Sequence, residues 1–205
     1  TLWYKFVIRS NTVGNSFLAV YADDFIAGFQ YKEDAERYYA LLKERLKKFN
    51  LELEESKSRM IEFGKYAEIN SKRKYGRKAE TFNFLGFTLY CGKSRHSGEF
   101  CVKLKTNSKK FTQKLKQTKE WLYQNNDLPV KDLITRLNKK LVGHYRYYGV
   151  SHNINKLSAF LHYVQRYLFK VLNRRSHKKS YTWDGYIDML KVYPLAKPKI
   201  YVKLF

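Results

Sequence analysis

The chain has 205 residues, of which 44% are apolar and 17% aromatic, and its formal net charge at pH 7 is +23. This apolar content is enough for a packed core and excludes a disordered chain. No apolar run reaches the roughly 18 residues that a membrane-spanning helix needs, so we expect no such helix.

The N-terminal residues and the two cysteines indicate the cellular compartment and the extent of the chain. We expect no signal peptide, because residues 1–10 lack a basic segment followed by an apolar one. Thr1 in the first position indicates a piece of a longer protein. Cys91 and Cys101 are too few for a disulfide scaffold. They either face each other across a hairpin or are buried free thiols; free thiols are favoured, which predicts a cytoplasmic protein.

The positive charge is unevenly distributed. Residues 1–70 contain 11 Lys or Arg and 11 Asp or Glu, whereas residues 71–205 contain 30 and 7, which accounts for the whole excess of 23. A one-sided excess of this size indicates a polyanionic partner, either nucleic acid or an anionic membrane. The many tyrosines among the basic residues favour nucleic acid, because bases stack on aromatic rings, so we expect no membrane partner.

The first third of the chain has strand-like and helix-like patterns. β-Branched and aromatic residues with Asn and Gly between them predict strands at residues 3–9, 16–21 and 25–29. Residues 33–49 have apolar side chains at helical spacing and acidic residues at the start, which predicts an amphipathic helix.

The middle of the chain is less regular. We expect short strands at residues 51–54 and 60–63, followed by a mobile polar loop at 65–80. Residues 81–91 and 99–105 are predicted to form a second hairpin.

The last third is helical in period. We expect helices at residues 108–124, 130–148, 155–174 and 183–191, with the break between the first two at Asn126 to Pro129. The predicted fold class is therefore α+β: a partial palm made of an antiparallel sheet and a helix over residues 1–105, then an all-helical basic bundle over 106–205.

The helix predicted at residues 155–174 has two distinct faces. Its apolar stripe runs from Leu157 to Leu172, and a second face is both cationic and aromatic. We expect nucleic acid to bind that second face and the neighbouring basic residues, a set that comprises Lys103, Lys105, Lys109, Lys110, Lys114, Arg146, Tyr163, Arg166, Lys170, Arg174 and Arg175.

The strongest chemical signal is Tyr21-Ala22-Asp23-Asp24, which lies between two apolar strands. Adjacent carboxylates raise each other's pKa and resist burial unless a cation compensates them. Hard oxygen ligands of this kind bind Mg²⁺, which activates the attacking hydroxyl in nucleotidyl transfer. The alternative is a solvated Asp-Asp turn whose side chains cap their own backbone.

This motif resembles the active-site hairpin of reverse transcriptases. The residues that follow the first predicted helix, Asn50 to Lys57, are similar to the next motif of that family, in which a strand leads to a lysine proposed to protonate the leaving pyrophosphate. The resemblance assigns this role to Lys57; the alternative is an ordinary surface lysine. Phe84-Leu85-Gly86-Phe87 looks like the primer-grip hairpin, where Gly86 would allow close approach of the backbone; the alternative is a core hairpin.

The last third resembles the maturase region of group II intron proteins. The resemblance rests on Leu137-Asn138, on Gly143 to Tyr148 and on a long helix that ends in Asn173-Arg174-Arg175. His144 replaces the usual tryptophan and Arg146 the usual asparagine. Tyr145 and Tyr148 are either part of an RNA site or part of the core.

The resemblance implies a fragment of an RNA-directed DNA polymerase that binds group II intron RNA and an RNA/DNA template-primer. It implies two Mg²⁺ ions held by Asp23 and Asp24 together with a third aspartate, expected in an N-terminal portion that is missing here with the fingers. We therefore expect this chain alone to be inactive. The alternatives are a non-catalytic RNA-binding splicing factor and a basic helical module with an accidental motif.

Overall fold

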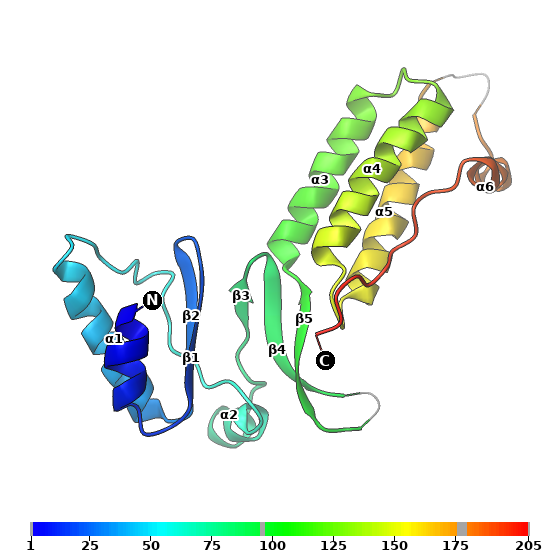
Figure 1. The fold of residues 1–205 in the computed structure, drawn as a ribbon. Helices are drawn as coiled ribbons and strands as arrows, with labels where there is room; N and C mark the ends of the chain where they lie inside the picture. The colour runs from blue at the N-terminus through cyan, green and yellow to red at the C-terminus, as the bar shows by residue number, and fades with distance from the viewer. Residues whose placement is uncertain (1, 95–96, 176–179, 205) are drawn as a thin grey trace. The chain divides into compact units, whose positions relative to one another are not determined.

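The computed structural model describes residues 2–94, 97–175 and 180–204, and the chain divides into two compact units at Glu62 and Phe63 (Figure 1). Among the described residues, none of the helices has the length and apolar character required to cross a membrane.

The first unit begins with helical turns instead of the strand predicted at residues 3–9. A π-helix, η1, spans Tyr4–Ile8, and a 3₁₀ turn, η2, spans Arg9–Asn11. Tyr4 and Ile8, four residues apart, are both buried, as on one face of a helix. The run is apolar almost throughout, so its pattern does not distinguish a strand from a buried helical segment.

A two-stranded antiparallel hairpin and one helix complete the first unit. Strands β1 (Ser16–Tyr21) and β2 (Asp24–Phe29) pair in the register Ser16 to Phe29. Helix α1 (Lys32–Lys47) follows, close to its predicted bounds. Its buried face, with η1, packs against one side of the hairpin in a cluster that comprises Tyr4, Ile8, Leu18, Ala27, Phe29, Tyr38 and Leu42.

The prediction of short strands at residues 51–54 and 60–63 is wrong, because the chain forms no strand in either range. Asn50 has a left-handed backbone with φ 53°, and a turn follows in which the backbone N–H groups of Lys57 and Ser58 both donate to the Glu54 carbonyl. These local hydrogen bonds use the groups that a strand would need for a neighbour.

The second unit begins with a helix where the sequence predicted a mobile loop at residues 65–80. Helix α2 (Ala67–Tyr75) ends at Gly76, which adopts the left-handed conformation with φ 63° that often terminates helices. The Ser71 hydroxyl donates to the Lys78 carbonyl, which fixes the chain after the helix. The segment is too polar for its period to show, but its basic last turn suits the helix dipole.

The second hairpin predicted from the sequence is confirmed, and the structure has a third strand beside it. Strands β3 (Phe82–Phe84), β4 (Phe87–Lys93) and β5 (Phe100–Thr106) form an antiparallel sheet in that order. Cys91 pairs with Val102 and Cys101 with Gly92, so the two thiols lie on opposite faces of the sheet. Both are free, as predicted, although they are half-buried rather than buried.

Four helices follow the sheet at the predicted places. They are α3 (Ser108–Gln124), α4 (Val130–Tyr148), α5 (Ile154–Asn173) and α6 (Trp183–Val192), and Figure 1 shows α3, α4 and α5 side by side. Their apolar faces form the main core, where Leu122, Leu133, Leu137, Leu157, Val164, Leu168 and Val171 have no exposed surface.

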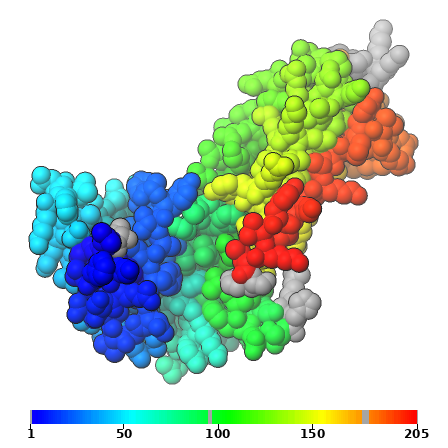
Figure 2. Space-filling view, viewed as in Figure 1, coloured from blue at the N-terminus to red at the C-terminus, as the bar shows by residue number. Residues whose placement is uncertain are grey.

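The C-terminal segment lies on this bundle (Figure 2). The Asn138 amide in α4 donates to the Pro194 carbonyl at 2.9 Å, and its oxygen accepts the Ala196 N–H at 2.7 Å. Further along, the N–H groups of Tyr201 and Val202 donate to the Gly149 carbonyl. Asn138, one of the residues that carried the maturase resemblance, thus anchors the last segment of the chain.

The α+β fold class predicted from the sequence is confirmed: small antiparallel sheets and a helix are followed by a helical bundle. The division of the chain into domains over residues 1–105 and 106–205 stays a prediction.

A buried amide joins three of these elements. Asn153 has no exposed surface; its oxygen accepts the Thr106 N–H at 2.8 Å, and its NH₂ donates to the Thr106 hydroxyl and the Tyr148 carbonyl, both at 2.8 Å. The end of β5, the end of α4 and the start of α5 therefore meet at one side chain.

We predict that Asn153→Ala lowers the free energy of unfolding by about 3 kcal/mol, because the Thr106 N–H and the Tyr148 carbonyl lose a buried partner. Urea unfolding followed by circular dichroism measures the change. Asn155→Ala, at an exposed position two residues away, is the control and should alter stability by less than about 0.5 kcal/mol. Equal effects of the two variants would show that the amide has no special role.

Candidate functional site

The paired carboxylates lie at the tip of the β1–β2 hairpin. Tyr21 pairs with Asp24, so Ala22 and Asp23 form a two-residue turn. Ala22 has φ 54°, a conformation that residues other than glycine rarely adopt, so the turn holds local strain. Asp23 and Asp24 are both exposed. The arrangement presents two adjacent anionic side chains to solvent at a tightly constrained position.

The strand register shows which face of the hairpin carries Asp24. Cross-strand partners point to the same side, so Tyr21 and Asp24 share a face with the pair Phe17 and Gly28. The opposite face packs on α1 through Leu18. On the first face Phe17 is 60% and Tyr21 64% exposed, so Asp24 belongs to the face that α1 does not cover.

The other end of the hairpin is held by a buried carboxylate. Asp34 in α1 is 2% exposed and accepts the N–H groups of Val13 and Gly14 at 3.0 and 3.1 Å. Arg37 donates to its second oxygen at 2.8 Å. Since Val13 and Gly14 immediately precede β1, Asp34 fixes the entry of the strand that ends in the Tyr-Ala-Asp-Asp turn.

Asp23 and Asp24 suit Mg²⁺ by chemistry and by access, since exposed carboxylate oxygens are the ligands this ion prefers. They do not form a full ligand set by themselves. Within the described ranges, no group of three or more His, Cys, Asp or Glu side chains gathers closely enough to hold a metal ion.

Lys57, predicted as a proton donor, lies in the exposed turn that replaces the expected strand. The Ser56 hydroxyl, and to a smaller degree the charge of Lys57, lower the pKa of Glu54. Nearby, Glu55 accepts a hydrogen bond from Lys43 at 2.6 Å. The proton-donor role of Lys57 stays a prediction.

The Phe84 to Phe87 segment forms the tight turn between β3 and β4. Phe84 pairs with Phe87, and both central residues are left-handed, with φ 48° at Leu85 and 77° at Gly86. This is the geometry of a type I′ turn, and it is strained at Leu85. A Cβ at Gly86 would lie 3.1 Å from the Tyr148 hydroxyl oxygen, so the turn packs closely on that side chain. The primer-grip role of this turn stays a prediction.

Helix α4 holds this turn. The Tyr147 hydroxyl donates to the Leu85 carbonyl at 3.1 Å, and the Tyr148 ring packs edge-on against Phe87 with 5.3 Å between centroids. The Asn107 N–H donates to the Gly86 carbonyl at 2.9 Å. Tyr148 is therefore part of the core, whereas exposed Tyr147 positions the turn.

The predicted nucleic-acid residues have different degrees of exposure. Exposed side chains belong to Lys109, Lys110, Lys114, Arg146, Tyr163, Arg166, Lys170 and Arg174. Lys103 and Lys105 are half-buried on β5, where the Lys105 ammonium lies 5.1 Å from the Tyr90 ring centroid. Arg175 is also half-buried; burial lowers its pKa, and its Nε and Nη2 have no hydrogen-bond partner in the described part of the chain.

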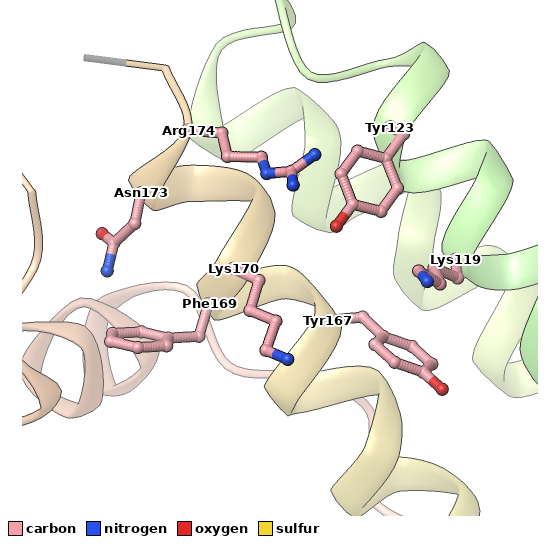
Figure 3. Close-up of a pocket in the computed structure, with 7 residues that line it drawn as sticks. All are labelled: Lys119, Tyr123, Tyr167, Phe169, Lys170, Asn173 and Arg174. Carbon is pink, nitrogen blue, oxygen red and sulfur yellow. The ribbon is translucent and has the colours of Figure 1, made fainter. Parts of the chain in front are cut away.

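Sequence reasoning missed three residues next to this set, namely Lys119, Tyr123 and Tyr167. Across a surface hollow, Lys119 and Tyr123 on α3 face Tyr167 and Lys170 on α5 and Arg174 at the C-terminal end of that helix (Figure 3). Lys119 and Tyr123 are four residues apart, as are Lys170 and Arg174, so each pair lies on one helix face. The repeated cation and tyrosine pattern was a usable signal, but only the packing of α3 against α5 brings the two faces together.

Comparison with known families covers most of the chain. Residues 3–89, which include both strained turns, match the family model for reverse transcriptase (RNA-dependent DNA polymerase). Residues 108–186, from α3 into α6, match the model for the group II intron maturase-specific domain.

The chain belongs to the group II intron reverse transcriptase and maturase family. This confirms the resemblance seen in the sequence. Searches of curated proteins and of solved structures gave no match.

Within the maturase region, His144 stands where the family resemblance led us to expect tryptophan. Its ring stacks on Phe160 with 3.9 Å between centroids and 14° between planes. Burial, and next the charge of Lys114, lower the pKa of His144 to about 4. The imidazole is therefore neutral at pH 7 and packs as an aromatic ring. An aromatic side chain thus still occupies the position where the family resemblance led us to expect tryptophan.

The lowered pKa makes stability depend on pH. Below about pH 6.5 the unfolded chain protonates His144 while the folded chain does not, so stability falls as pH drops from 7 toward 4. We predict a loss of about 2 to 3 kcal/mol from this group, and its absence in His144→Phe. Urea unfolding of both proteins at pH 4 to 7 isolates the difference, and parallel pH profiles would contradict the assignment.

Proposed function

We propose that this chain binds group II intron RNA through its second unit and supplies part of the active site of an RNA-directed DNA polymerase. The observation that carries the polymerase role is the β1–β2 turn, which presents Asp23 and Asp24 to solvent and accepts strain at Ala22. A turn with only a structural task has no need for adjacent carboxylates or for a non-glycine residue at φ 54°.

The charge distribution supports RNA binding by the second unit. Residues 1–62 hold 10 basic and 10 acidic residues, whereas residues 63–205 hold 31 and 8, so the net charge of +23 belongs to the second unit alone. Helix α5 contains no Asp or Glu. Phosphate groups neutralise such a surface and release counterions, which favours binding.

Asp23 and Asp24 would hold Mg²⁺ together with a further ligand from another part of the polymerase, as is general for reverse transcriptases. The bound ion would activate the primer hydroxyl and stabilise charge on the transferred phosphate. The turn from Phe84 to Phe87, braced by Tyr147, has the rigidity needed to hold a primer end. The template-primer itself is part of the proposal.

A second candidate is a splicing factor that binds intron RNA without polymerising. It is favoured by the location of the charge, because the basic residues of the second unit do not need the Asp23-Asp24 turn to bind RNA. Both candidates share the RNA-binding surface, and only the role of the hairpin differs.

We predict that the 205-residue chain binds structured RNA with an affinity that falls at least about 100-fold between 50 and 200 mM salt. The double variant Arg166→Ala and Lys170→Ala should bind several-fold more weakly and show a shallower dependence on salt. The matched control is Lys47→Ala with Lys48→Ala, which removes two exposed cations from the first unit and should bind like the parent. Filter binding measures all three, and affinity independent of salt would exclude the proposed RNA surface.

We predict that Asp23→Ala reduces primer extension to background in a complete polymerase that contains this chain, because a metal ligand is lost, while RNA binding is retained. Glu44→Ala, at an exposed carboxylate of α1 in the same unit, should extend primers normally. The 205-residue chain alone should not extend primers. Extension by Asp23→Ala would remove the metal assignment, and a complete polymerase that binds RNA but never extends would support the splicing factor.

A further inference from the structure

The hollow between α3 and α5 differs from a plain basic surface. It has a volume of about 520 Å³ and is lined by Lys119, Tyr123, Tyr167, Phe169, Lys170, Asn173 and Arg174. This size lies within the range of pockets that hold small molecules, about 300 to 1,000 Å³. Its lining combines cations and aromatic rings and contains no carboxylate.

Two of the three cations of the hollow, Lys119 and Arg174, have aromatic partners, and none of the three has an anionic partner among the described residues. The Arg174 guanidinium lies 5.1 Å from the Tyr123 centroid, and the Lys119 ammonium lies 5.9 Å from both the Tyr123 and Tyr167 centroids. Neither of these two cations, nor Lys170, forms an ion pair in the described ranges. Three uncompensated cations around one hollow attract an anion.

Tyr123 and Tyr167 are the rings of the hollow that its cations contact. In the described part of the chain, neither Tyr123 nor Tyr167 stacks on another aromatic ring, and both are half-buried and hence restrained. Phe169, by contrast, packs against Trp183 and Tyr186 with 5.2 Å between centroids in each case, and Figure 3 shows it turned away from Tyr123.

The rest of the lining is rigid. The Asn173 amide donates to the Tyr181 carbonyl at 3.0 Å and accepts the Tyr181 N–H at 2.7 Å, so it braces the chain beside the hollow and has little capacity left for a ligand. A second hollow, beside His144, is different, because its rings already stack on other rings: His144 stacks on Phe160, and Tyr147 stacks on Phe87.

We propose that the α3–α5 hollow binds one unpaired nucleotide of the RNA, with its base against Tyr123 and Tyr167 and its phosphate among Lys119, Lys170 and Arg174. The inference rests on the proposed RNA-binding function and specifies which feature of the RNA this site takes. A regular duplex presents phosphates but no free base, whereas a bulged nucleotide presents both. Stacking on tyrosine is tolerant of base identity, so the site selects an extruded nucleotide and not a sequence.

The test compares two RNA hairpins that differ by one nucleotide: one has a single 2-aminopurine bulge and the other is fully paired. The 205-residue chain should bind the bulged hairpin about tenfold more tightly, and the 2-aminopurine fluorescence should change on binding. Tyr123→Leu combined with Tyr167→Leu should abolish this preference while binding of the paired hairpin stays within about twofold. Tyr123→Phe keeps the ring and should keep the preference.

A matched control lies outside the hollow. The Arg77 guanidinium lies 5.1 Å from the ring of exposed Tyr75, the same distance as in the Arg174 and Tyr123 pair. Tyr75→Leu should leave the bulge preference unchanged. Lys119→Gln, at an exposed position, tests the phosphate contact if the double tyrosine variant does not fold; it should reduce the preference several-fold.

The outcomes separate the two proposals. Salt-dependent binding of both hairpins with no bulge preference would overturn the nucleotide site and leave the RNA surface standing. Equal loss of preference in Tyr75→Leu would also overturn it. Binding of neither hairpin would overturn the proposed function itself. Tighter binding of a polyglutamate peptide than of the bulged RNA, lost in Lys119→Gln, would show that the hollow takes an acidic protein segment instead.

Discussion

The second unit depends on the buried amide of Asn153. An amide offers both an acceptor and two donors, and here all three are used, toward the main chain and side chain of Thr106 and the carbonyl of Tyr148. Because Thr106 ends β5 and Tyr148 ends α4, the sheet and the bundle are locked at one point in a dry environment, where a missing partner is expensive. The turn at Leu85 and the hollow between α3 and α5 lie on elements that start or end near this junction.

The two turns that carry the reverse transcriptase resemblance are built alike. Each is a two-residue hairpin turn with a non-glycine residue at positive φ, Ala22 in one and Leu85 in the other. Strain of this kind persists where the surroundings fix the backbone. Asp34 does so at the far end of the first hairpin, and Tyr147 and Asn107 do so directly at the second. Rigid presentation is therefore a property of both turns.

Much of the fold was predictable because its signals are strong. Helices α3 to α6 have sustained apolar periods, and the two hairpins have clear turn residues. The failures share a physical cause. Residues 3–9 are apolar almost throughout, so their period is ambiguous, and α2 is a polar helix whose stability comes from its Gly76 end and from packing at Ala67 and Ser71. Neither feature appears in an apolar pattern.

The candidate site was predictable only in part, for a related reason. The Asp23-Asp24 turn and the exposed face of α5 are local in sequence, and both are found where they were expected. The hollow is not local, since Tyr123 and Tyr167 are 44 positions apart and meet only when α3 packs on α5. Arg175 was predicted to bind nucleic acid with the neighbouring basic residues, whereas its side chain is half-buried after the end of α5.

The neutral first unit and the strongly basic second unit differ in what they need in order to stay folded. With 31 basic and 8 acidic residues, the second unit repels itself, and this self-repulsion weakens its compact state. A polyanion that associates with the folded form relieves the repulsion and adds its binding free energy to stability. Under the proposed function, RNA would stabilise the fold of the second unit as well as bind to it, so we expect the chain to be more stable with RNA than without it.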